Sequence, residues 1–174
     1  MALRMVAESE AGAHAGIYGE IRSRLGLGIV PNVFKAMAAV SHDVLAQNWT
    51  AFRQTVLEGC LPRTVKEMVA LVVSREHGCE YGVYLYSYSL FHLGISRPVV
   101  ESLAELGDCP EFPPDFRRLL AFAREYSIDP EGVDPDFLEM AGFSEDDALQ
   151  VVDTVLIASG MARFAVECGL PVDL

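Results

Sequence analysis

Apolar residues recur every three or four positions along most of this chain. The pattern is clear in residues 13–25, 42–58 and 144–167, and it is the period of one face of an α-helix. The alternation of apolar and polar residues that is typical of β-strands is nearly absent. The pattern therefore predicts an all-α protein.

Helix caps and breakers divide this pattern into separate helices. Proline is tolerated in the first helical turn, and glycine commonly follows the last one. By these rules the predicted helices cover residues 13–25, 31–40, 42–58, 62–77, 80–93, 96–106, 115–127, 136–141 and 144–167. For the fourth helix, Pro62 competes as a start with a capping box formed by Thr64 and Glu67, and we favour Pro62.

The length and composition are those of one globular domain. The 174 residues, of which 51% are hydrophobic, are enough for a single domain over residues 1–174 with a core from about 15 to 170. The mean hydropathy of +0.26 indicates a rich core or an apolar surface covered by a partner subunit. Since no run of about 18 apolar residues occurs, we expect no membrane helix.

The charge argues against nucleic acid and anionic membranes as partners. The formal net charge is −12, and the 13 Lys and Arg residues are scattered singly along the sequence. The N-terminal segment lacks the apolar block and cleavage site of a secretory signal, so we expect a cytoplasmic protein. Four widely spaced cysteines do not suggest a disulfide framework.

The segment from Glu67 to Gly94 holds the candidate chemistry. Glu67 directly precedes the all-apolar run of residues 68–73, and such a helix is buried on all sides. Glu67 is either a first-turn acid that the helix dipole stabilises or a buried carboxylate with a raised pKa. Cys79 follows the Gly78 break at a helix start, where a thiolate is favoured; alternatively it is a small buried hydrophobe.

Tyrosines and histidines surround this corner. Four of the six tyrosines lie within eight residues, and they either pack between helices or line a pocket: Tyr81, Tyr84, Tyr86 and Tyr88. His77 lies beside the corner and His92 at the far end of the fifth helix. A single histidine is more often structural than catalytic. No two histidines have the spacing of a metal site, so no metal or other cofactor is expected.

Glu67, Cys79 twelve positions later and a helix that ends at Gly94 resemble the alkylhydroperoxidase D-like (AhpD-like) group of the carboxymuconolactone decarboxylase superfamily. That group's signature is Glu, eleven residues, then Cys-x-x-Cys-x-x-x-His. Three further segments are similar to its peroxidase-related branch: Ile29–Met37, Phe116–Ala123 and Gly142–Ser144. The resemblance covers about residues 15–170 and implies an AhpD-like helical bundle with a central buried helix hairpin.

The resemblance also implies thiol redox chemistry, with two departures. The family's Glu and first Cys fall on Glu67 and Cys79, but its second Cys falls on Gly82 and its His on Tyr86. The two-cysteine cycle therefore cannot run within this motif. We expect Cys79, Glu67 and Tyr86 as catalytic residues. The expected pocket-lining residues are Gly82, Tyr81 and His77.

Three functions stay open at this point. A one-cysteine peroxidase would oxidise Cys79 with an organic hydroperoxide and reduce it again with an external thiol. A non-redox, decarboxylase-like enzyme would use Glu67 and Tyr86, with Gly82 making room for its ligand. A non-catalytic homologue would bind a ligand or partner. The family resemblance implies a homo-oligomer, either a trimer or a hexamer. The sequence leaves open whether Cys79 pairs with Cys60, Cys109 or Cys168.

Overall fold

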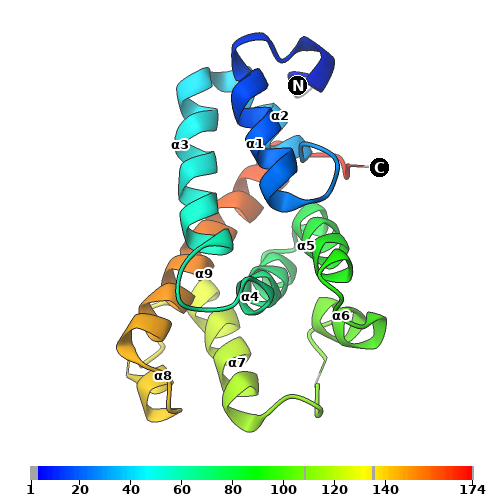
Figure 1. The fold of residues 1–174 in the computed structure, drawn as a ribbon. Coiled ribbons are helices and arrows are strands. Elements are labelled where there is room, and N and C mark those ends of the chain that lie inside the picture. The colour runs from blue at the N-terminus through cyan, green and yellow to red at the C-terminus, as the bar shows by residue number, and fades with distance from the viewer. Residues whose placement is uncertain (1–3, 108, 135, 174) are drawn as a thin grey trace.

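The computed structural model of the protein describes residues 4–107, 109–134 and 136–173, and within them it contains helices and no strand (Figure 1). The α-helices are α1 (Ala15–Leu25), α2 (Asn32–Val40), α3 (His42–Phe52), α4 (Arg63–Glu76), α5 (Glu80–His92), α6 (Arg97–Ala104), α7 (Pro114–Ile128), α8 (Phe137–Met140) and α9 (Glu145–Glu167). Three short turns complete the described elements: η1 (Glu8–Glu10), η2 (Gly12–His14) and η3 (Arg53–Leu57). The all-α prediction is confirmed.

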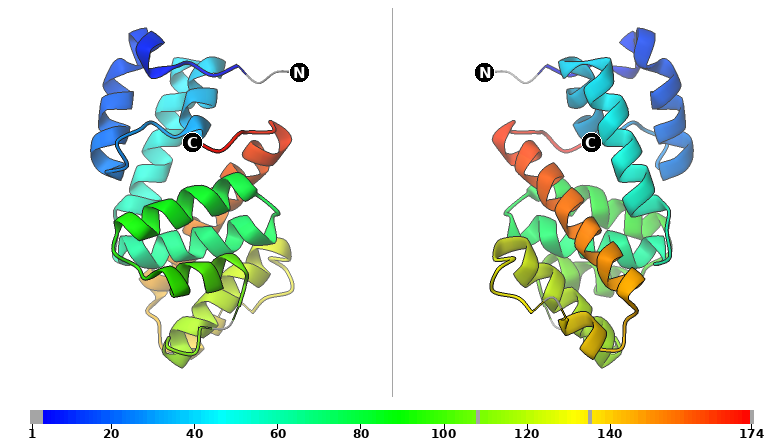
Figure 2. Two further views of the ribbon diagram at one scale, coloured as in Figure 1. Left: turned by 90° about the vertical axis from the view of Figure 1, so that its right-hand side faces the viewer. Right: turned by 90° about the vertical axis from the view of Figure 1, so that its left-hand side faces the viewer.

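Helix α4 lies at the centre of the bundle. It packs against α5, α9, α7 and α6, and all nine residues from Lys66 to Ser74 are buried. Figure 2 shows α4 and α5 side by side as an antiparallel hairpin, with α9 crossing behind them and α1 to α3 above. This central buried hairpin is the one that the family resemblance implies.

The helix ends follow the local sequence closely. Pro62 is the N-cap of α4, and the competing capping box does not form because Glu67 lies a full turn inside the helix. Gly78 adopts a left-handed φ of +63°, a conformation that costs glycine little, and this turns the chain from α4 into α5. Ser144 and Asp147 form a capping box at the start of α9.

The third predicted helix differs from the structure in its last turn. The sequence predicts one helix over 42–58, whereas α3 ends at Phe52 and continues as the π-helical turn η3. A π turn inserts an extra residue and rotates the side chains that follow it. Here it brings Thr55 and Val56 into the interior, where Thr55 Oγ1 donates a hydrogen bond to Asp153 Oδ2 of α9 at 2.6 Å.

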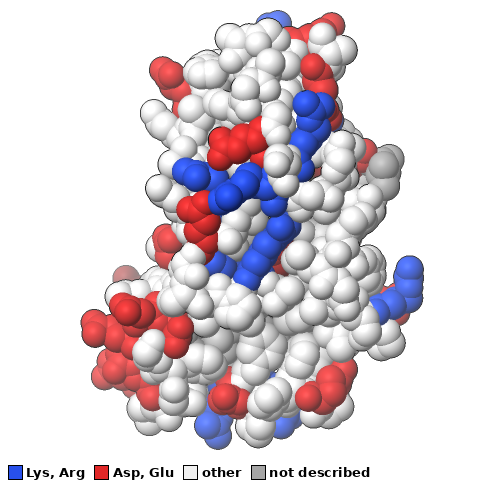
Figure 3. Space-filling model, in the orientation of Figure 1, with Lys and Arg blue, Asp and Glu red and all other residues white. Residues whose placement is uncertain are grey.

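Folding gathers some of the basic residues that are scattered in the sequence. Arg24 and Arg53 both pair with Glu58, and the Lys66 ammonium donates to the Glu58 carbonyl. Figure 3 shows Lys and Arg side chains together with acidic ones in the middle of this face. Because carboxylates are interleaved with the cations, the cluster is not a uniformly basic patch.

Helix α9 is more apolar than the sequence criterion detected. It is long and apolar enough to cross a membrane by length and composition, with a window hydropathy of 1.4. This helix contains no uninterrupted apolar run of about 18 residues, because Gln150, Asp153 and Arg163 interrupt it. One face of α9, including Val155 and Ala162, packs into the core, while Leu149 and Leu156 are exposed. A partner subunit on such exposed side chains stays a prediction.

The central position of α4 predicts a large cost for truncating its core side chains. Leu71 is 0% exposed, so Leu71→Ala leaves a cavity and should lower the free energy of unfolding by about 2–5 kcal/mol. The same truncation at Leu149, which is 61% exposed, should change it by less than about 0.5 kcal/mol. Urea denaturation of both variants measures the difference. Similar losses in the two variants would contradict the central burial of α4.

Candidate active site

Glu67 is a buried carboxylate held by one cation. Its Oε1 accepts a hydrogen bond of 2.6 Å from Nε of Arg63, one turn earlier on α4, and Oε2 has no hydrogen-bond partner among the described residues. Arg63 is itself fixed, because it also donates to the carbonyl of Leu25 and to Oγ of Ser89. Burial raises the pKa of Glu67, and the positive charge of Arg63 opposes this only in part. Of the two interpretations of Glu67, the structure supports the buried carboxylate.

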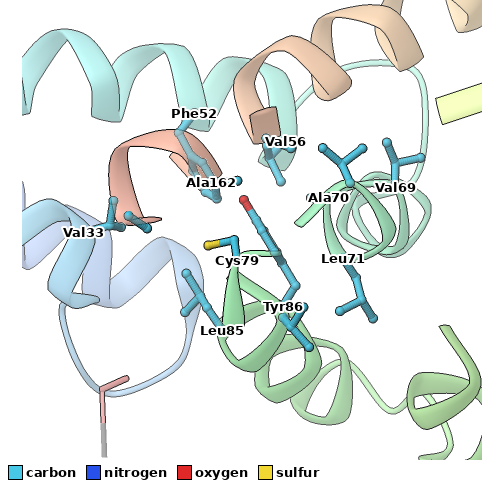
Figure 4. Packing of buried hydrophobic residues seen from close by; sticks show 14 of the residues in the cluster. Val33, Phe52, Val56, Val69, Ala70, Leu71, Cys79, Leu85, Tyr86 and Ala162 are labelled. Atoms are coloured by element: carbon cyan, nitrogen blue, oxygen red, sulfur yellow. The ribbon is translucent and has the colours of Figure 1, made fainter. Parts of the chain in front are cut away.

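Tyr86 lies between Glu67 and Cys79. It projects from α5 into the core, and its hydroxyl has no hydrogen-bond partner in the part of the chain that the structure describes (Figure 4). Burial raises the pKa of Tyr86 far above its ordinary value, and the charges of Glu67 and Cys79 raise it further. The phenol therefore stays protonated and can donate its hydrogen to an oxygen brought next to it.

Cys79 is the N-cap of α5 and is 1% exposed. Its Sγ accepts a hydrogen bond from the backbone N–H of Gly82 at 3.3 Å, the contact by which a helix start stabilises a thiolate. Burial is the larger effect and raises the pKa of the thiol above its ordinary value. At neutral pH the resting residue is thus a protonated thiol. In this respect Cys79 matches the buried-hydrophobe interpretation more closely than the thiolate one.

Two small cavities flank Tyr86. One is bordered by Cys79, Ser74 and Gly82, and the other by Glu67 and Ser89, while Tyr86 and Leu85 border both. Each has a volume of about 10 Å³, which is at the lower limit for one water molecule. Cys79 and Glu67 therefore each share one of these cavities with Tyr86.

Gly82 does not open space for a ligand, contrary to the expectation from sequence. A Cβ at this position would lie 2.4 Å from Oγ and 2.9 Å from Cβ of Ser74. The side chain of Ser74 thus fills the volume beside Gly82. Oγ of Ser74 is buried and has no hydrogen-bond partner within the described ranges, so it adds a third unpaired polar atom to those of Glu67 and Tyr86.

Of the two remaining candidates, Tyr81 lies at the Cys79 cavity and His77 lies away from both cavities. Tyr81 borders the Cys79 cavity, and its hydroxyl accepts a hydrogen bond from the N–H of Val33 at 3.0 Å. His77 borders neither cavity, because it caps the end of α4 on the side of α9, where Nε2 lies 3.1 Å from Oγ of Ser159. His77 is therefore not brought together with the other site residues.

Sequence reasoning missed the supporting residues of the site. Arg63 is four positions before Glu67 and Ser89 is three positions after Tyr86, so helical spacing places each on the face of a site residue. That spacing was available in the sequence, but nothing in it distinguishes these side chains from ordinary surface residues. All four cysteines are free thiols. Over the described residues no three His, Cys, Asp or Glu side chains are grouped to hold a metal ion.

A family model described as the carboxymuconolactone decarboxylase family matches residues 43–125, the segment that carries Glu67, Cys79 and Tyr86. Similar solved structures include an uncharacterized peroxidase-related protein from Silicibacter sp. TM1040, with a TM-score of 0.82, 20% identity, and 97% of this chain and 88% of that chain covered. Residues 43–125 thus match the carboxymuconolactone decarboxylase family, and the helical fold is that of the AhpD-like structures.

Two further structures share this AhpD-like fold. The AhpD core of a peroxidase-related protein from Ralstonia eutropha JMP134 has a TM-score of 0.79 at 22% identity, with 91% of this chain and 84% of that chain covered. A Cys-to-Ala variant of the debrominase Bmp8, in complex with 2,3,4-tribromopyrrole, has a TM-score of 0.84 at 18% identity, with 99% and 92% covered. No curated protein matches the sequence.

The contact between Gly82 and Ser74 predicts coupled substitutions. Gly82→Ala places a methyl group against Ser74, and such overpacking should cost about 1–3 kcal/mol of stability. Combining it with Ser74→Gly removes both close atoms, so the double variant should be more stable than the sum of the two single changes. A double-mutant cycle by urea denaturation measures this coupling. Strict additivity would show that the two residues do not compete for one volume.

The raised pKa of Cys79 predicts its pH profile. The thiolate is the reactive form, and its fraction rises about tenfold per pH unit below the pKa. Because the pKa lies above the ordinary 9.0, alkylation of Cys79 by iodoacetamide should still be rising steeply at pH 9. Peptide mass spectrometry over pH 6–10 follows the reaction. A plateau below pH 8 would mean that the helix start, and not burial, controls this thiol.

Proposed function

We propose that this protein is a thiol-dependent oxidoreductase of the peroxidase type, in which the sulfur of Cys79 reduces a hydroperoxide. One observation supports this above the others. The thiol of Cys79, the phenol of Tyr86 and the carboxylate of Glu67 follow one another through the core, and the last two each have an unpaired oxygen. Buried polar atoms without a hydrogen-bond partner are rare in proteins, and a catalytic role is one explanation for them.

The proposed step transfers two electrons from sulfur to the peroxide. Cys79 Sγ attacks the distal oxygen of the hydroperoxide; an S–O bond forms and the O–O bond breaks. Cys79 becomes a sulfenic acid and the leaving alkoxide becomes an alcohol. The thiol proton passes by way of Tyr86 to the carboxylate of Glu67, with one water in each flanking cavity bridging residues that no direct hydrogen bond joins, and a proton returns along the same path to the alkoxide. The raised pKa of Glu67 makes its carboxylate a stronger base than that of an ordinary glutamate.

An external thiol completes the cycle in this proposal. The neighbouring family position is Gly82, so no second sulfur stands one helical turn from Cys79. Two molecules of a small thiol reduce the sulfenic acid to the Cys79 thiol, and the products are water and the corresponding disulfide. Structural relatives named as peroxidase-related proteins agree with redox chemistry of this kind.

A second candidate function is acid–base catalysis without the thiol. Glu67, Tyr86 and Ser89 border a cavity to which Cys79 does not contribute. A carboxylate with a raised pKa beside a protonated phenol is a suitable pair for moving a proton on a carbonyl compound. The family model's description as a decarboxylase family agrees with this alternative.

The redox proposal is tested by hydroperoxide consumption. With cumene hydroperoxide and dithiothreitol, Cys79→Ser should abolish turnover because the reacting sulfur is gone. Tyr86→Phe and Glu67→Gln remove one proton-transfer group each and should lower the rate by about 10²–10⁴-fold. Cys60→Ser, at an exposed cysteine outside the cavities, should leave the rate unchanged and serves as the matched control.

The same variants separate the alternatives. Turnover that survives Cys79→Ser contradicts the redox proposal. If the wild-type protein consumes no hydroperoxide but acts on a lactone in a manner that Glu67→Gln abolishes, the acid–base function is correct. Inactivity in both assays, with ligand binding retained in a thermal-shift screen, would identify a non-catalytic homologue.

A further inference from the structure

An apolar groove runs along the outside of α9, beside α3. It is bordered by Val44 and Asn48 of α3, by Met37 of α2, and by Leu156, Gly160 and Met161 among the residues of α9. We call it the α3–α9 groove. Its volume is about 320 Å³, within the range of small-molecule sites. It is much larger than either cavity beside Tyr86.

The groove and the Cys79 cavity share a wall. Met161 is a lining residue of both. Helix α2 also borders both spaces. Met37 lines the groove, and Val33, one helical turn earlier, lines the Cys79 cavity. Figure 4 shows Val33 and Ala162, the residue after Met161, on the side of Cys79 where its sulfur lies.

The shared wall is made of a side chain that can move. Methionine has three rotatable side-chain bonds and adapts to irregular spaces. Met161 is only partly buried, so its thioether can swing outward without opening the rest of the core. Such a rotation would join the α3–α9 groove to Cys79, and side-chain rotations of this kind take place within nanoseconds.

The chemistry of the groove selects an uncharged, apolar ligand. No Asp, Glu, Lys or Arg borders it, so a charged ligand would lose its hydration without gaining a partner. Asn48 is the polar side chain in its lining, and its amide nitrogen already donates to the carbonyl of Val44 at 2.8 Å. The groove therefore offers a ligand the carbonyl oxygen and the second N–H of the Asn48 amide, and an otherwise apolar surface.

We propose that the α3–α9 groove binds an uncharged, apolar organic molecule and that Met161 is the gate through which this molecule reaches Cys79. The inference rests on the proposed function, because it supplies the access path by which a substrate reaches the thiol.

Paired thiol reagents test this without any turnover. N-phenylmaleimide and N-(4-carboxyphenyl)maleimide react alike but differ in charge, and peptide mass spectrometry gives the rate at Cys79 relative to the exposed Cys60 in the same molecule. In the wild-type protein the neutral reagent should modify Cys79, relative to Cys60, at least tenfold faster than the anionic one. Met161→Ala should raise the Cys79 rate several-fold, whereas Met140→Ala, at a residue 80% exposed on α8, should not.

A plug in the groove gives the opposite change. A Cβ at Gly160 meets nothing within 4 Å, so Gly160→Phe fills the groove without disturbing the core and should slow the neutral reagent at Cys79 at least fivefold. Gly16→Phe, at an equally open position of α1, is the matched control and should have no effect. Circular dichroism confirms that each variant is folded.

The outcomes separate this inference from the proposed function. Unchanged Cys79 rates in both Met161→Ala and Gly160→Phe overturn the groove assignment, even if the protein reduces hydroperoxides. If the maleimide rates at Cys79 are as predicted but the protein consumes no hydroperoxide, the groove assignment holds and the proposed peroxidase reaction is wrong. Slower Cys79 modification at higher protein concentration, with a larger species in size exclusion, would place a second copy of the chain in the groove and would also overturn the inference.

Discussion

Helix α4 is buried along its polar as well as its apolar positions, from Lys66 to Ser74. That burial removes the Glu67 carboxylate from water and leaves the guanidinium of Arg63 as its one ion-pair partner in the described structure. It also sets Ser74 against Gly82 of α5, so the hairpin is closely packed where the family has a second cysteine. Burial of each side chain, Glu67 on α4 and Cys79 and Tyr86 on α5, is the first cause of its raised pKa.

Helix positions were predictable from sequence because their causes are local. Pro62 before α4, Gly78 after it and Ser144 before α9 each act within one turn, and the predicted boundaries agree closely with the structure. The π turn η3 was not predictable, because it depends on Thr55 meeting Asp153 from a distant helix. The same limit applied to Gly82, whose surroundings depend on a side chain eight positions earlier on another helix.

Cys79 differs from an exposed redox cysteine because its thiol is enclosed and protonated. A protonated, enclosed thiol is protected from indiscriminate oxidation and needs both a base and an access path before it reacts. In the proposed function Glu67, acting through Tyr86, supplies the base, and the α3–α9 groove behind Met161 supplies the access path. In the proposed function, that combination gives a slow but selective reaction with apolar electrophiles.

The central claim is that Cys79 is the sulfur that reacts with a hydroperoxide. The most direct measurement exposes the reduced protein to one equivalent of cumene hydroperoxide with dimedone present, which traps sulfenic acids. Peptide mass spectrometry then locates the adduct. The account predicts a dimedone adduct on Cys79, even though Cys60 is the more exposed thiol. An adduct confined to Cys60, with Cys79 unmodified, would contradict it.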